Sequence, residues 1–276
     1  MIDLHTHTIE SDGRCTPAEL VARARASGVD VLAVTDHDTV SGCEATAAAC
    51  TANGIEFVPG IEITAAHGRR DVHILGYFFD VTSPSLNEFL RTQRQARVDR
   101  VRQIVARLAD LGIPLDEEEL LRPAIDDPRK AAGRPWIARA LVAGGYVGSA
   151  SEAFDRWLGH GKPAFIPRCG ASPAEVFTRI HGAGGVAALA HPALVRHDEW
   201  IEGFVADGLD ALEAYHSEHD AAATSRYLTI AQSMGIAVSG GSDFHGDDSH
   251  GPPHPGAVSL PLEAYEQLVR RRNCRL

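Results

Sequence analysis

The sequence is poor in cysteine and has no long apolar run. Its five cysteines, among 276 residues, are widely spaced, odd in number and without a CxxC pair, which argues against a disulfide framework and favours a reducing cytoplasm. No stretch approaches the roughly 18 to 20 apolar residues that span a bilayer, and the N-terminus lacks the basic-then-apolar pattern of a signal peptide. We therefore expect a cytoplasmic protein that does not bind a membrane, and nothing in the sequence implies a stable protein partner.

Basic residues are also in the minority. The 26 Lys and Arg are outnumbered by 37 Asp and Glu, which gives a formal charge of −11. This balance argues against an extended nucleic-acid-binding surface, because affinity for phosphate backbones comes from clustered cations. The exception is a predicted helix with six arginines from Arg91 to Arg107. Two interpretations stay open: a solvated helix face with ion pairs, or a local basic wall that attracts anionic substrates.

Short apolar runs that alternate with amphipathic segments predict an α/β fold. With 44% hydrophobic residues, the chain can bury a full core. Strands are expected over residues 2–7, 31–34, 55–63, 72–78, 186–190, 209–214 and 236–239. Helices are predicted between most of these strands, which is typical of parallel-sheet units.

Between residues 85 and 165 helical spacing replaces the strand pattern. Val101, Ile104 and Leu108 recur at helical intervals. Further helices are expected at about 117–122, 134–144 and 151–158. We predict that residues 1–84 and 166–276 form one α/β barrel, and that residues 85–165 are an inserted helical subdomain that caps its mouth.

Residues of metal-binding type recur where the predicted strands end. Side chains i and i+2 of a strand point to the same face, so His5 and His7 can bind one ion together, as can Asp243 and His245. The set comprises His5, His7, His37, Glu62, His73, His191, Asp243 and His245. Because reactive groups of α/β barrels gather at the carboxyl ends of the strands, we expect a single metal pocket there.

The composition of this set indicates the kind of site. Imidazole and carboxylate groups together suit Zn²⁺, Mn²⁺ or Fe²⁺. The absence of nearby cysteine argues against a closed structural zinc site. An open, catalytic metal site is therefore favoured.

Seven motifs, in order along the chain, resemble those of the PHP (polymerase and histidinol phosphatase) family. They are His5-Thr6-His7, Ser11-Asp12-Gly13, Thr35-Asp36-His37-Asp38, Pro59-Gly60-Ile61-Glu62, Val72-His73-Ile74-Leu75-Gly76, Ala190-His191-Pro192 and Gly241-Ser242-Asp243-Phe244-His245. The resemblance implies a distorted (β/α)₇ barrel. The helical insertion, with Gly133-Arg134-Pro135, resembles the subgroup of nucleoside 3′,5′-bisphosphate phosphatases and the related 5′-to-3′ exoribonuclease.

The resemblance also implies three ion positions. The first is formed by His5, His7, Glu62 and Asp243, the second by a bridging Glu62 with His73 and His191, and the third by Asp12, His37 and His245. Two or three divalent ions are expected. Mn²⁺ is favoured, with Zn²⁺, Fe²⁺ and Mg²⁺ as alternatives, because Asp12 is a hard ligand where many family members have histidine. Glu62, Asp243 and His191 are also the candidate catalytic residues.

The expected activity is hydrolysis of the 3′-phosphate of nucleoside 3′,5′-bisphosphates, with short 5′-phosphorylated RNA as a second substrate. Arg134, Lys162, His216 and His219 are candidate substrate-binding residues, with a surface position as the alternative for each. Histidinol phosphate or another small phosphomonoester is a rival substrate. A rival of another class is a non-catalytic metal-binding module.

Overall fold

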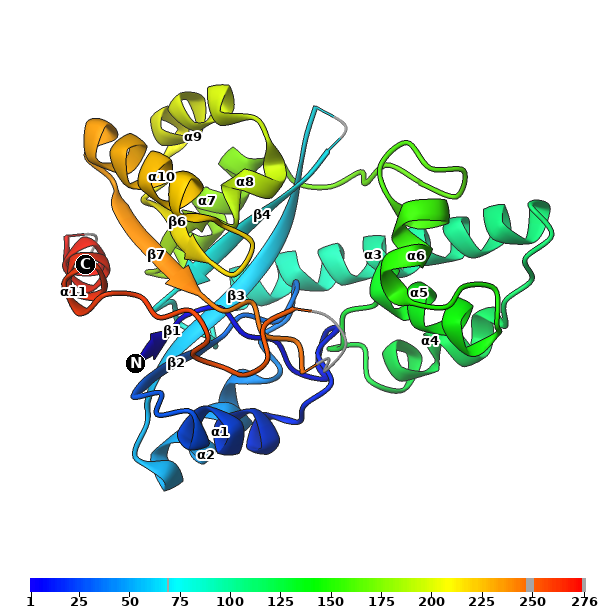
Figure 1. The fold of residues 1–276 in the computed structure, drawn as a ribbon, viewed down its shortest axis with the longest axis horizontal. Helices are drawn as coiled ribbons and strands as arrows, with labels where there is room; N and C mark the ends of the chain where they lie inside the picture. Colours follow the sequence, from blue (N-terminus) through cyan, green and yellow to red (C-terminus); the bar gives the residue numbers. More distant parts are fainter. Residues whose placement is uncertain (69, 247–250, 275–276) are drawn as a thin grey trace.

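The computed structural model describes residues 1–68, 70–246 and 251–274. Seven strands form one sheet in sequential order. They are β1 Ile2–Asp3, β2 Val31–Val34, β3 Glu56–His67, β4 Arg70–Tyr77, β5 Val186–Leu189, β6 Ala211–His216 and β7 Ala237–Gly241. A hydrogen bond from Leu4 N to Gly240 O and a bridge between Thr6 and Phe244 bring the two ends of the sheet together. The sheet is a nearly closed barrel, which confirms the predicted distorted (β/α)₇ fold (Figure 1).

Helices surround the barrel and also extend to one side of it (Figure 1). Those around the barrel are α1 Pro17–Ala26, α2 Cys43–Asn53, α7 Pro173–Gly182, α8 Pro192–Val195, α9 Ile201–Asp207, α10 Ala221–Met234 and α11 Leu262–Asn273, with a 3₁₀ turn at Asp198–Trp200. Those to the side are α3 Pro84–Asp110, α4 Glu117–Asp126, α5 Arg134–Ala143, α6 Ala150–Ala153 and a π-helical turn at Phe154–Leu158. In the described part of the chain, no helix combines the length and apolarity needed to cross a membrane.

The sheet differs from the expected parallel pattern at β4. This strand runs antiparallel to both β3 and β5, whereas the other neighbouring strands are parallel. The reason is that no helix lies between β3 and β4, and a parallel connection needs a crossover of about a dozen residues or more.

The first strand is shorter than the predicted 2–7. After Asp3 the ladder stops, and the backbone N–H of His5 donates to the Asp3 carboxylate. That carboxylate also accepts hydrogen bonds from the backbone and hydroxyl of Ser242. Beyond Asp3 the chain keeps separate backbone hydrogen bonds, such as Leu4 N to Gly240 O and His7 N to Phe244 O, and an isolated bridge at Thr6, in place of a continuous ladder.

The barrel has a main hydrophobic core and a smaller cluster around α1 and α2, and a second core lies in the insertion. Helix α3 contributes to the main core and to the second core. Leu86 and Leu90, near its start, pack in the barrel core. Ile104 and Leu108, near its end, pack with Ile137 of α5 in the second core. The division between the cores falls inside one continuous helix. The domain bounds at residues 84–85 and 165–166 stay a prediction.

Candidate metal centre

The nine predicted ligand side chains converge at one mouth of the barrel. Ligand atoms lie within 4.8 Å of one another in four overlapping groups: His7, Asp12, His37 and His245; His5, His216 and Asp243; His5, His7 and Glu62; and His37, Glu62 and His73. His191 joins them, with Nε2 3.1 Å from Glu62 Oε1. These ten residues are called the histidine–carboxylate cluster below. The grouping differs from the three predicted sets, and the role of each residue as a ligand stays a prediction.

Two cluster residues lie within strands rather than at strand ends. The register of Val34 opposite Pro59 places Glu62 three residues beyond the end of β2. Because β4 is antiparallel, its beginning lies at the barrel mouth, where His73 pairs with Thr64. The expectation that all ligands follow strand ends is wrong for Glu62 and His73. Strand β3 extends beyond the end of its neighbour β2, and β4 runs antiparallel to β3.

Strained backbone conformations aim three residues at this mouth. Asp38, His191 and Asp243 have φ values of 50°, 29° and 57°, and they are three of the five non-glycine residues with positive φ in the described part of the chain. This region is disfavoured for L-residues with a Cβ, and such strain tends to persist at functional sites.

Glu62 is the centre of the cluster. Its Oε1 lies 2.7 Å from His73 Nδ1, and its Oε2 lies 3.1 Å from His37 Nδ1 and 3.3 Å from His7 Nε2. Burial would raise the pKa of this carboxyl, but the imidazoles of His37, His73 and His5 hold it well below its usual range. Glu62 is therefore an ionised carboxylate in contact with several imidazoles, as a bridging metal ligand needs to be.

The cluster has buried nitrogen atoms that fit bound cations. Among the described residues, His5 Nε2, both ring nitrogens of His7, and the Nδ1 atoms of His37 and His191 are buried without a hydrogen bond of acceptable geometry. Buried polar groups normally have partners. Mixed imidazole and carboxylate donors suit divalent transition metals, so the residues present fit the metal ions that the sequence predicts.

Glu213 supports the cluster and was not predicted. Its Oε1 lies 2.8 Å from His5 Nδ1, and its Oε2 accepts a hydrogen bond from His191 N at 2.7 Å. Outer carboxylates of this kind orient ligand imidazoles. The available signal in the sequence was a single acid within the largely apolar run Ala211–His216, and the structure shows that this acid is fully buried.

The two other histidines near β6 have different surroundings. His216 is buried, with Nε2 3.4 Å from Asp243 Oδ2, while its Nδ1 accepts a hydrogen bond from Glu218 N. It lies inside the cluster rather than at its edge. His219 contacts backbone through both ring nitrogens, at Ala214 O and Ala193 N. Substrate contact by either residue stays a prediction.

Three aspartates next to the motifs could have been orienting carboxylates or ordinary loop acids. Asp3 binds Ser242, and Asp36 binds the hydroxyls of Thr8 and Ser11. Asp38 binds arginines. Their hydrogen bonds hold loops and backbone in place, and none of the described ones goes to a cluster imidazole.

A cavity of about 230 Å³ adjoins the cluster. Asp12, His37 and His73 line it together with four arginines, Arg97, Arg100, Arg134 and Arg168, called the arginine wall below. Of the predicted substrate-binding residues, Arg134 thus lies beside the cluster. Lys162 is exposed and is not among the residues that line this cavity.

Carboxylates hold the arginine wall in place. Asp38 Oδ2 accepts hydrogen bonds from Arg97 and Arg168, and Asp71 Oδ2 accepts from Arg100 and Arg134. Burial would raise the pKa of Asp38, but the adjacent guanidinium groups lower it to about 2. Among the described residues, Arg168 Nε and Arg100 Nη2 are buried without a hydrogen-bond partner. The wall places four guanidinium groups around one cavity, which suits an anion.

The arginine-rich helix has both of the faces considered for it, and attraction of anionic substrates by its buried face stays a prediction. Arg97 and Arg100 face the barrel, whereas Arg91 and Arg102 are exposed and pair with Glu88 and Asp99. One face of α3 is a basic wall and the other is a solvated surface.

A cluster of side chains that could hold metal ions at a barrel mouth, with an arginine-lined cavity beside it, is typical of a metal-dependent phosphoesterase. A model of the PHP domain matches residues 3–140. A 3′,5′-nucleoside bisphosphate phosphatase from Chromobacterium violaceum is 35% identical, over 94% of this chain and 92% of its own. A 5′-3′ exoribonuclease from Haemophilus influenzae is 35% identical, over 88% of this chain and 89% of its own.

Solved structures agree with these sequence relatives. A protein from Bifidobacterium adolescentis assigned as a metal-dependent phosphoesterase is 34% identical, with a TM-score of 0.88 over 98% of this chain and 95% of that chain. The chain belongs to the PHP family. It is a phosphoric ester hydrolase, not a non-catalytic metal-binding module.

Proposed function

We propose that this enzyme removes the 3′-phosphate from nucleoside 3′,5′-bisphosphates and cleaves short 5′-phosphorylated RNA by the same reaction. In both, water adds to phosphorus and the P–O3′ bond breaks, so that the nucleoside 5′-phosphate leaves with a protonated 3′-oxygen. The two substrates differ only at the reacting phosphate, which in RNA carries the rest of the strand through O5′. The activities for which the two sequence relatives are named support this pairing.

The observation that carries the proposal is the arginine wall beside the histidine–carboxylate cluster. Guanidinium groups bind phosphate through paired hydrogen bonds. In the proposal, Arg134 and its neighbours hold the 5′-phosphate while the 3′-phosphate lies at the cluster. Binding of the remote phosphate then orients the reacting one. Histidinol phosphate has only one phosphate and does not use this wall.

The cluster residues would hold two or three divalent ions, with Mn²⁺ favoured. Such ions supply an activated water molecule and neutralise charge on the phosphoryl oxygens. Glu62, Asp243 and His191 are assigned as the residues on which catalysis depends most, because each contacts several other members of the cluster. Asp12 and Glu62 provide oxygen ligands that suit Mn²⁺.

In the proposed domain organisation, one domain carries the catalytic cluster and the other contributes most of the arginine wall. Residues 1–84 and 166–276 provide the cluster, and residues 85–165 cap the mouth and contribute Arg97, Arg100 and Arg134. The second hydrophobic core supports this division.

The test compares kcat/KM for a nucleoside 3′,5′-bisphosphate, the 3′-monophosphate and histidinol phosphate. Arg134→Ala should lower kcat/KM for the bisphosphate by about tenfold to a hundredfold, in line with the loss of a charge-assisted contact, and should change the 3′-monophosphate far less. Arg270→Ala is the control, because this arginine is an exposed cation on α11 outside the cavity. Lys162 is exposed and outside the cavity, and substrate contact by this residue stays a prediction. Equal efficiency on the three substrates, or a preference for histidinol phosphate, contradicts the proposal.

A further inference from the structure

A second and larger concavity lies against the insertion. Its volume is about 1260 Å³, beyond the roughly 300 to 1,000 Å³ of pockets that enclose a single small ligand. Trp136, Arg139, Ala140 and Ala143 of α5 line it. These positions are three, four and seven residues apart, so they share one face of the helix. The concavity is therefore a groove along α5, about 10 Å long between the first and last of these residues.

Helix α5 separates this groove from the arginine wall. Gly133 and Arg134, at its start, line the smaller cavity, and Trp136 and Arg139 line the groove. The loop that carries Asp12 likewise contributes residues to both the cluster and the groove. The Asp12 side chain belongs to the cluster, whereas its neighbours Ser11 and Arg14 line the groove. The groove thus starts within two residues of the cluster.

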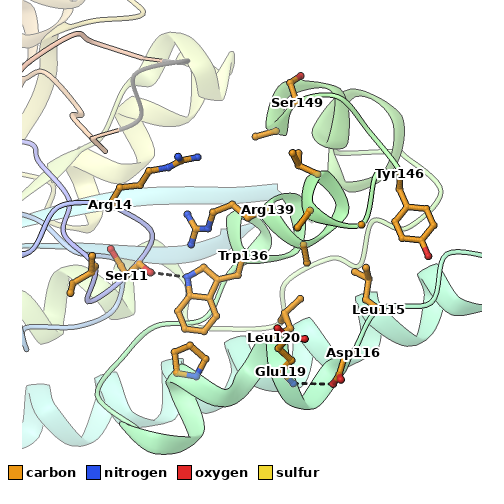
Figure 2. A pocket seen from close by; sticks show the side chains of 18 of the residues that line it. Ser11, Arg14, Leu115, Asp116, Glu119, Leu120, Trp136, Arg139, Tyr146 and Ser149 are labelled. Atoms are coloured by element: carbon orange, nitrogen blue, oxygen red, sulfur yellow. Dashed lines mark hydrogen bonds between the residues drawn. The ribbon is translucent and has the colours of Figure 1, made fainter.

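Hydrogen bonds fix the α5 wall to that loop. Trp136 Nε1 donates to Ser11 O at 2.8 Å, and Arg139 donates to Asp12 O at 3.0 Å. Figure 2 shows Arg14 and Arg139 at the end of the groove near Ser11, and Tyr146 at the other end. The two ends are held at a fixed distance by the helix between them.

The groove has the residue types that bind a single-stranded nucleic acid. Arg14, Lys130 and Arg139 supply positive charge at the end nearest the cluster. Tyr146 offers a partly exposed ring packed against the second core, with its hydroxyl bonded to Pro114 O. Cationic grooves with aromatic rings bind successive phosphates and bases without regard to sequence. Asp116 and Glu119 also line the groove. Their negative charge repels phosphate, so the phosphates of a bound strand would lie along the cationic side.

We propose that this groove binds the part of a short RNA that lies beyond the reacting phosphate. The inference rests on the proposed function: with the 5′-phosphate at the arginine wall and the next phosphate at the cluster, the remaining strand must leave the cluster through O5′. The groove begins at Ser11 and Arg14, in the loop that carries Asp12. A nucleoside bisphosphate has no such strand and leaves the groove unused.

The test uses the full-length enzyme with two substrates, a nucleoside 3′,5′-bisphosphate and a 5′-phosphorylated RNA tetranucleotide. Tyr146→Ala and Arg14→Glu should each raise KM for the tetranucleotide about five- to tenfold and leave bisphosphate hydrolysis within about twofold. Tyr146→Phe, which keeps the ring, and Arg270→Glu, an exposed cation on α11 outside the groove, should behave like the unmodified enzyme on both. The salt dependence of kcat/KM should be steeper for the tetranucleotide, by about 0.7 in logarithmic slope per bound phosphate.

The results separate this inference from the proposed function. Bisphosphate hydrolysis without tetranucleotide cleavage overturns the groove and the RNA part of the proposed function, and leaves the bisphosphate part standing. Equal losses on both substrates overturn the groove alone. If neither substrate is hydrolysed, the proposed function fails. The groove is then judged by fluorescence anisotropy of a labelled tetranucleotide: weaker binding by Arg14→Glu than by Arg270→Glu supports it, and equal binding overturns it.

Discussion

Asp38 and Arg97 form a buried ion pair that joins the barrel to helix α3. The Asp38 carboxylate lies in the loop after β2, and it also accepts a hydrogen bond from Arg168, which is 130 residues away in sequence. The pair connects the two halves of the site, because Asp38 follows His37 of the cluster and Arg97 belongs to the arginine wall.

Replacing Asp38 with asparagine should lower the free energy of unfolding by about 2 to 3 kcal/mol at neutral pH. The loss should become smaller as the pH falls below about 4. The carboxyl has a pKa of about 2 in the folded protein against an ordinary value of 3.8, and each unit of difference corresponds to about 1.4 kcal/mol. A lowered pKa stabilises the fold above pH 4, and this contribution is lost as the pH falls toward 2. Urea unfolding at pH 7 and at pH 3 should therefore show a smaller difference between the two proteins at pH 3. A constant difference would contradict this account.

Replacing Glu62 with glutamine should lower kcat by about a thousandfold or more, because the charge shared by several imidazoles is lost and the barrier rises by about 4 kcal/mol. The side chain keeps its size, so thermal unfolding should remain cooperative. Glu263→Gln, an acid on the exposed start of α11, is the control. Near-normal turnover of the Glu62 variant, saturated with metal, would show that the centre of the cluster is assigned wrongly.

Metal uptake should release protons. Burial would lower the pKa of His7, but Asp243 and Glu62 raise it to about 10 in the metal-free cluster, so its imidazole is protonated at neutral pH. Protonated imidazole does not bind a metal ion. The affinity for Mn²⁺ should therefore rise with pH from 6 to 8, and titration calorimetry in two buffers of different ionisation enthalpy should show proton release. Chelator should abolish activity, and Mn²⁺ should restore it. Binding without proton release would mean that these histidines are not ligands.

Replacing Glu213 with glutamine should weaken metal binding by about tenfold to a hundredfold, the usual effect of losing an outer carboxylate. Glu213 accepts hydrogen bonds from both His5 and the His191 backbone, so its loss disturbs two cluster residues at once. Measuring kcat with excess Mn²⁺ distinguishes the two variants: kcat should largely recover in Glu213→Gln but not in Glu62→Gln. A loss that excess metal cannot restore would place Glu213 among residues with a direct chemical role.

Local sequence patterns could predict the ligand motifs but not their supports. His5 with His7 is recognisable by its spacing, and the two share a ligand group. Asp243 and His245 follow the end of β7, and the positive φ of Asp243 directs them to different ligand groups, so the expectation that they lie on one face of a strand is wrong. The positions of Glu62 and His73 inside strands depend on the reversed direction of β4, which no local pattern shows. The partners of Asp38, Asp71 and Glu213 are set by tertiary packing, because Arg168 and Arg134 are far from the carboxylates they meet.

The continuous helix α3 also determines how the active site opens. Its 27 residues span about 40 Å, and its two ends are anchored in different hydrophobic cores. A swing of the insertion away from the barrel would have to bend a helix and break the Asp38 and Asp71 ion pairs, which costs far more than rotation about a flexible loop. The helix and its ion pairs therefore hold the arginine wall and the histidine–carboxylate cluster at a set separation. Under the proposed function, such an enzyme would select a substrate by the distance between its two phosphates, and product would leave without the opening of a lid.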